Sequence, residues 1–110
     1  MGDRGNIVIE KDGKPVLYFY THWTRSRLPS IVAAGLEHGR GRWGDSSYLN
    51  RALFQTLIEG DGGILGYGIS STMGDGGTEV YIDHDKKRVS YNDTGYTFES
   101  FIAKYQEVTK

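Results

Sequence analysis

Arginine and aromatic side chains are concentrated between Tyr18 and Arg51. This stretch contains both tryptophans and five arginines, and between Lys14 and Lys86 every basic residue other than histidine is an arginine. The guanidinium group is a planar fork of donors that matches phosphate or carboxylate, and an aromatic ring can stack on a nucleobase. The residue types and their spacing therefore predict a binding site for a small phosphate-bearing molecule.

Ten residues carry the side chains that such a site would use. They are Tyr20, His22, Trp23, Arg25, Arg40, Arg42, Trp43, Tyr48, Arg51 and Tyr67. We expect Arg40, Arg42 and Arg51 to hold phosphate or ribose and the tryptophans to stack on the base. The tyrosines and the histidine would form hydrogen bonds to the remaining groups of the ligand. A shift of one residue in strand register would turn Trp23 from the pocket to the core, so both orientations stay open.

The sequence contains one fragment of a catalytic signature. His22-Trp23-Thr24 matches half of a two-histidine phosphoesterase motif, but neither His38 nor His84 has a serine or threonine two positions later. We therefore expect no catalytic residues, and lean against an enzyme. His22 acting alone as a general base near neutral pH remains an alternative.

Two further motifs are explained more simply than by a cofactor or a metal. The segment Gly39–Gly44 has the spacing of a dinucleotide fingerprint, but it follows a predicted helix instead of a strand. Its backbone could still present N–H groups to an anion just before a helix that starts near Ser46. Asp83-His84-Asp85 falls in a predicted hairpin turn followed by lysines. We expect neither a cofactor nor a bound metal.

Composition limits the range of partners and locations. The chain has 110 residues and a net charge of −1, which predicts one domain over 1–110 and no binding of long nucleic acid. No apolar run approaches the roughly 20 residues of a membrane span, so we expect no membrane partner. The absence of cysteine is typical of a reducing cytoplasm, where we expect the protein to act.

The chain predicts an α+β fold: a single domain with a five-stranded, mainly antiparallel sheet and helices packed on one face. Asp12-Gly13 is a two-residue hairpin signal between two predicted strands, over 6–10 and 16–23. Pro29 and Gly39 are typical of the start and end of a helix, and Asp45 of a helix cap. Thr94 or Thr97 begins the last helix. The predicted order is β-β-α-α-β-β-β-α.

The same residues carry a resemblance. Tyr20-Thr21-His22-Trp23, then Arg42-Trp43-Gly44-Asp45, then Gly66-Tyr67-Gly68-Ile69-Ser70 look like the motifs of small uncharacterised proteins of bacteria, notably actinobacteria, and their phages. The resemblance covers roughly Ile7 to Tyr91 and brings no assigned activity. Occurrence in phages implies counter-defence as a class of function.

These observations lead to three functional expectations. The first is a non-enzymatic, phage-type protein that sequesters a small phosphate-bearing nucleotide signal as a homodimer, in the host-cell cytoplasm if phage-encoded. The second is a protein–protein inhibitor of a host defence factor, because Trp, Tyr and Arg also form interface hot spots. The third is a small nucleotide hydrolase or phosphodiesterase. An accessory domain whose arginines contact only solvent also stays open.

Overall fold

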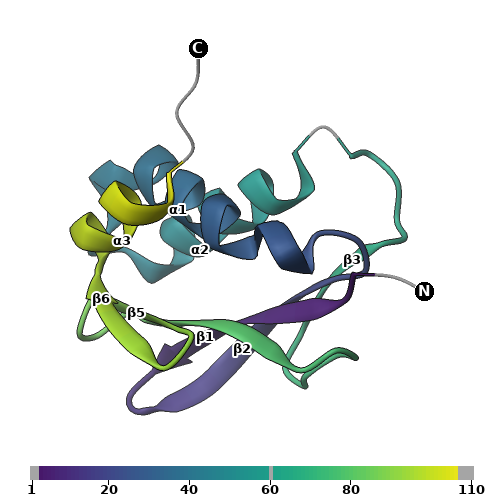
Figure 1. Ribbon diagram of the computed structural model, residues 1–110, viewed down its shortest axis with the longest axis horizontal. Coiled ribbons are helices and arrows are strands. Elements are labelled where there is room, and N and C mark those ends of the chain that lie inside the picture. Colours follow the sequence, from purple (N-terminus) through teal and green to yellow (C-terminus); the bar gives the residue numbers. More distant parts are fainter. Residues whose placement is uncertain (1–2, 60, 107–110) are drawn as a thin grey trace.

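Three helices lie on one face of a sheet in the computed structural model, which describes residues 3–59 and 61–106 (Figure 1). The strands are β1 (Gly5–Lys11), β2 (Lys14–Thr21), β3 (Tyr67–Ser70), β4 (Thr78–Asp83), β5 (Arg88–Tyr91) and β6 (Thr94–Thr97). The helices are α1 (Leu28–His38), α2 (Ser46–Ile58) and α3 (Phe98–Tyr105), with 3-10 turns at Arg25–Arg27 and Arg40–Arg42. The predicted α+β class, with helices on one face, is thus confirmed.

The described sheet has six strands where the sequence predicted five, in the order β3-β2-β1-β4-β5-β6. Neighbouring strands are antiparallel except β1 and β4, which are parallel. The missed strand is β6, whose residues we had placed at the start of the last helix. Asn92 and Asp93 both adopt positive φ, at 54° and 62°. Asn and Asp tolerate this conformation, so the pair forms a hairpin turn, and only Thr97 caps α3.

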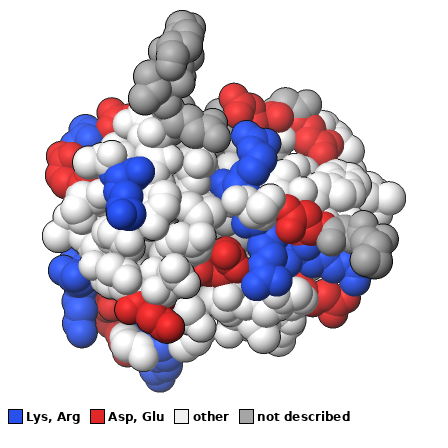
Figure 2. All heavy atoms as spheres, in the orientation of Figure 1, with Lys and Arg blue, Asp and Glu red and all other residues white. Residues whose placement is uncertain are grey.

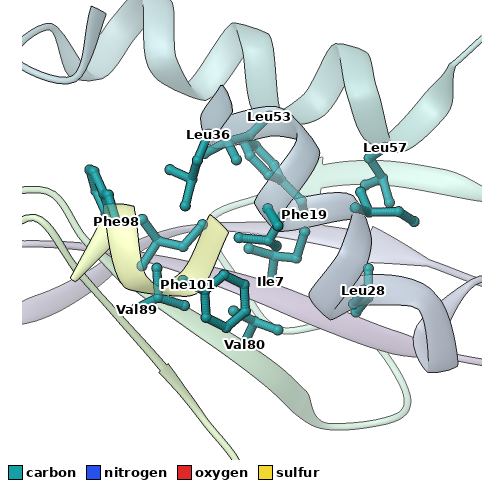
Figure 3. Packing of buried hydrophobic residues seen from close by; sticks show 14 of the residues in the cluster. Ile7, Phe19, Leu28, Leu36, Leu53, Leu57, Val80, Val89, Phe98 and Phe101 are labelled. Atoms are coloured by element: carbon teal, nitrogen blue, oxygen red, sulfur yellow. The ribbon is translucent and has the colours of Figure 1, made fainter. Parts of the chain in front are cut away.

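The core fills the space between the helices and the covered face of the sheet (Figure 3). Alternation along each strand places one set of side chains under the helices, because successive residues point to opposite faces. Buried members from strands and helices include Ile7, Ile9, Phe19, Leu36, Leu53, Val80, Val89 and Phe101. At Gly35, a Cβ would lie 3.1 Å from the Leu53 Cα, so glycine allows α1 and α2 to approach closely.

The connection from β3 to β4 crosses the sheet face that the helices leave uncovered. Asn6, which is fully buried, fixes this crossing through its side-chain amide. Its Nδ2 donates to the carbonyl oxygens of Gly74 and Gly77 at 3.0 and 2.8 Å, and its Oδ1 accepts from the Gly74 N–H at 3.0 Å. The crossing lies directly against the Tyr20 ring, which a Cβ on Gly74 would approach to 2.6 Å.

The predicted strand over 16–23 is displaced from the observed β2, so His22 and Trp23 lie just beyond the strand. They begin the connection that leads to α1. Within the described residues, none of the helices has the length and apolar character needed to cross a membrane.

Candidate functional site

The ten predicted residues fall into two groups at opposite ends of α1. One group lies at the end of β2 and the start of β3 and includes Trp23, while the other precedes or lies in the first turns of α2 and includes Arg42. The eleven residues of α1 separate them by about 16 Å of helix. The structure therefore does not bring all ten into one pocket.

The Trp23 cluster consists of Tyr20, His22, Trp23 and Tyr67. Trp23 is 52% exposed, and its ring meets Tyr67 edge to face with ring centroids 5.7 Å apart. The Tyr20 hydroxyl lies 3.4 Å from His22 Nδ1. The Trp23 ring lies against the backbone of Gly66, which leaves no room for a side chain there. Trp23 therefore does not point into the core, which was one of the two orientations that the sequence left open.

Arg25 lies beside this cluster but has a partner of its own. Its Nε donates to Glu79 Oε1 at 2.8 Å, which joins the segment before α1 to β4. Its aliphatic carbons cover Gly5, where a Cβ would meet the Arg25 Cγ at 2.8 Å. Arg25 is therefore engaged in holding the fold.

Arg40 and Trp43 fasten α3 to the connection between α1 and α2. Arg40 forms ion pairs with Glu37, at 2.6 Å, and with Glu99, and these two carboxylates raise the pKa of Arg40. Its guanidinium lies over the Trp43 ring, 4.9 Å from the centroid. Trp43 Nε1 donates to the Leu36 carbonyl oxygen at 2.9 Å. These interactions occupy the groups that would otherwise face a ligand.

Arg42 and Arg51 differ from Arg25 and Arg40 because, among residues 3–59 and 61–106, neither forms an ion pair with a carboxylate. The Arg42 guanidinium lies 5.0 Å from the ring centroid of Tyr48, which is 58% exposed, and Arg51 lies one helical turn beyond Tyr48. Three of the ten predicted residues, Arg42, Tyr48 and Arg51, thus form an exposed, cationic Arg–Tyr patch across the 3-10 turn before α2 and the first turns of α2.

The expected anion position at the start of α2 has a side-chain occupant. Asp45 caps the helix, as its residue type predicted, and its Oδ1 accepts from the Tyr48 backbone N–H at 3.3 Å. A negatively charged cap leaves this end of the helix unfavourable for a second anion. A phosphate is better placed at the arginine side chains than at these backbone groups.

The Arg–Tyr patch borders a groove between α2 and the strands β2 and β3. The groove has a volume of about 400 Å³, and its lining residues are Leu17, Phe19, Ser47, Asn50, Arg51, Phe54, Gln55, Ile58 and Ile69. Leu17 is accessible here because β3 pairs only with the second half of β2. Sequence reasoning missed this groove. The signal available was the face of α2 that carries Ser47, Arg51, Phe54 and Ile58 at spacings of three and four.

His84 lies in the predicted hairpin turn between β4 and β5, but its side chain is buried against α2 and is not solvated. It is 6% exposed, and its Nε2 lies 2.7 Å from Asn50 Oδ1, so we assign the Nε2–H tautomer as donor. Burial lowers the pKa of His84, and the charge of Lys11 adds to this effect. Within the described residues, no three His, Cys, Asp or Glu side chains are grouped as a metal site.

This buried histidine predicts a pH dependence of stability. The unfolded chain binds a proton at His84 below about pH 6.5, whereas the folded chain keeps the ring neutral to lower pH. The free energy of unfolding should therefore fall as the pH drops below about 6.5. Urea denaturation at pH 7.5 and 5.5 should show that the free energy of unfolding falls less between these two pH values in His84→Gln than in the parent. In His38→Gln, which changes an exposed histidine, it should fall as much as in the parent. Equal losses in all three would contradict the assignment.

Comparison with protein-family models, curated proteins and solved structures finds no match to this chain.

Proposed function

We propose that the protein is a non-catalytic binding protein for a small phosphate-bearing nucleotide, held in the groove beside α2. The observation that carries this proposal is the position of Arg51, a guanidinium without a carboxylate partner among the described residues, at the rim of an apolar groove. Small-molecule sites combine largely apolar walls with a few convergent polar groups, and the volume of about 400 Å³ lies within their usual range.

In this arrangement the base contacts the apolar walls and the phosphate lies at the arginines. Phe54, Leu17 and Ile69 provide the walls, and Asn50 and Gln55 provide hydrogen-bonding groups to the base or ribose. Arg51 binds the phosphate, with Arg42 and Tyr48 at the outer end of the patch. Two arginines suffice for a small nucleotide, whereas a long nucleic acid requires an extended basic surface. Figure 2 instead shows basic and acidic side chains interspersed on the face that it presents.

The composition of the groove favours binding over turnover. None of its nine lining residues is a histidine, carboxylate, cysteine or lysine. His22, the one candidate general base, belongs to the Trp23 cluster beyond the other end of α1. Binding without turnover fits sequestration of a signalling nucleotide, which is the biological role we propose, and the resemblance to phage proteins supports counter-defence as its setting.

Arg51→Ala tests this proposal. Loss of a charge-assisted hydrogen bond of about 1.5–3 kcal/mol should weaken nucleotide binding tenfold or more, because phosphate loses its principal partner. We would screen a panel of mono-, cyclic and ADP-ribose-type nucleotides by native mass spectrometry and titrate the hits by calorimetry. Arg88→Ala, which removes an exposed arginine from β5, is the matched control and should bind as the parent does.

Three outcomes separate the proposals. An intact bound nucleotide whose affinity falls in Arg51→Ala but not in Arg88→Ala supports the groove. Equal affinity in all three proteins would place the ligand elsewhere. A chemically altered nucleotide would replace the binding proposal with the hydrolase alternative, and His22→Ala would then be the next variant.

A protein–protein inhibitor is the second candidate, and the exposed Trp23 favours it. Tryptophan and arginine are common interface anchors, and Arg27 lies near the Trp23 cluster in a shallow pocket that it shares with Tyr67. This candidate predicts that Trp23→Ala abolishes capture of one macromolecular partner, such as a host defence protein, while Arg51→Ala does not. A parent that ignores every nucleotide of the panel and captures such a partner would make this the leading function.

A further inference from the structure

Among the residues that the structure describes, β3 is a short sheet edge without the charges, proline or covering element that usually prevent strand pairing. It is the outermost strand, and the segment 62–74 around it contains no charged residue. Exposed edges are normally protected by charges, by proline or by a covering element. The part of β2 that β3 leaves unpaired begins with Lys14-Pro15, and the opposite edge strand β6 leads directly into α3. Within the described residues, β3 is thus the edge best suited to accept another strand.

The backbone of β3 offers a defined set of free groups. The His22 N–H donates to the Gly66 carbonyl oxygen at 2.8 Å, and the register continues as Thr21 opposite Tyr67 and Tyr20 opposite Gly68. Hydrogen-bonded and non-hydrogen-bonded pairs alternate along antiparallel strands. Gly68 therefore bonds toward β2, whereas the N–H and C=O groups of Tyr67 and Ile69 point outward.

We propose that β3 pairs with β3 of a second copy of this chain, antiparallel, so that the two sheets become continuous. A two-fold axis at Gly68 places Tyr67 of each copy opposite Ile69 of the other. The outward backbone groups then form four hydrogen bonds, and each pairing of Tyr67 with Ile69 joins an aromatic to a β-branched side chain, which is a favourable cross-strand contact. Gly68 faces Gly68 on the axis, where no side chain obstructs the approach.

The strand that pairs with β3 comes from a second copy of this chain because the segment 62–74 is complementary to itself. A two-fold interface presents the same patch twice, so any charge near the axis would meet its like. The chain carries 27 charged residues, yet the segment 62–74 contains none of them. The flanking Ile64 and Leu65 are 93% and 76% exposed, and Ile69 is 55% exposed. Pairing covers the backbone edge beside Ile69, and the same register places Ile64 and Leu65 opposite residues 72 and 71 of the second copy. Exposed apolar edges of this kind favour aggregation of a monomer.

The pairing also affects the groove beside α2. Ile69 forms the β3 wall of that groove, and the part of the chain that the structure describes has no further strand beside it. Tyr67 of the second copy would lie next to Ile69 and extend this wall. Pairing through β3 does not require the proposed ligand.

Charge substitutions at Gly68 test both the interface and its register. A Cβ on Gly68 meets no atom within 4 Å, so the monomer accommodates a side chain there. In the pair, two such side chains lie directly opposite each other. Gly68→Glu and Gly68→Lys should each weaken dimerisation at least about fivefold at low salt, because like charges repel. Their equimolar mixture should restore a dimer, and Gly68→Ala is the uncharged control.

Sedimentation equilibrium over a wide concentration range would give the masses, starting from 12.3 kDa for one chain. The parent and Gly68→Ala are expected to be dimers. Gly68→Glu alone and Gly68→Lys alone should dimerise more weakly. Their mixture should form a dimer that contains one copy of each variant. A parent that stays monomeric would overturn the proposal, whether or not another protein's strand is later found on β3. Charge variants as dimeric as the parent, or a mixture that stays monomeric, would also overturn it. Titration of nucleotide into Gly68→Glu tests the ligand proposal separately, so that failure of the dimer proposal can be told apart from failure of nucleotide binding.

Discussion

Asn6→Asp is expected to destabilise the protein by about 4 kcal/mol or more at pH 7. The substitution keeps the shape of the side chain but replaces an amide donor with a carboxylate. Asn6 is fully buried, and its Nδ2 lies within 3.0 Å of the Gly74 and Gly77 carbonyl oxygens. Aspartate would lose these hydrogen bonds and place a buried negative charge against carbonyl oxygens, and each of these changes is costly.

Asn50→Asp is the matched control because Asn50 acts through its oxygen. Its Oδ1 lies 2.7 Å from His84 Nε2, so a carboxylate retains the acceptor. Urea denaturation at pH 7 should show a change below about 1 kcal/mol for Asn50→Asp. The destabilisation by Asn6→Asp should shrink at pH 4–5, where protonation removes the charge and supplies one donor. Similar stability of the two variants at pH 7 would show that Asn6 does not hold the connection from β3 to β4 in place by donating hydrogen bonds.

Trp43→Ala is expected to cost about 3 kcal/mol of stability. The half-buried indole packs edge to face on Phe98 with ring centroids 5.3 Å apart, and it donates a hydrogen bond to Leu36. Removing it leaves a cavity beneath α3 and an unpaired carbonyl oxygen. It also removes the ring on which Arg40 lies, and with it part of the link between Arg40 and α3.

Thermal denaturation should record this loss as a fall in Tm of roughly 10–20 °C. Trp43→Phe retains most of the packing and removes the donor, so it should cost about 1–2 kcal/mol. Both variants should bind nucleotide as the parent does at temperatures where they are folded. Loss of nucleotide binding without loss of stability would reverse this interpretation, and Trp43 would then be the stacking residue that the sequence predicted.

Local signals predicted most of the elements of the fold. Asp12-Gly13 forms its hairpin turn with φ of 57° and 79°, and Asp45 caps α2. These features depend on interactions between near neighbours in the chain, and so they can be read directly from the sequence. The strand β6 was missed because its turn, Asn92-Asp93, is a weaker hairpin signal than Asn-Gly or Asp-Gly, and the following threonines are also typical of a helix cap.

The sequence also determined which residue types are available for binding. It concentrated arginines and tryptophans around α1, and it left the segment 62–74 without charge. What it did not determine was which of these side chains remain available. Arg25 pairs with Glu79 and Arg40 with Glu99, carboxylates that lie 54 and 59 residues further along the chain.

The tertiary structure alone decided that Arg42 and Arg51 remain without such partners among the described residues, and that Arg51 borders a groove. That groove depends on the rotation of α2 and on a strand β3 that is shorter than β2, so Phe54, Leu17 and Ile69 meet from three separate elements. No local preference specifies such a meeting, because it follows from the packing of the whole core. The sequence thus determined the chemistry available to this protein, and the packing of distant segments decided where that chemistry remains free to act.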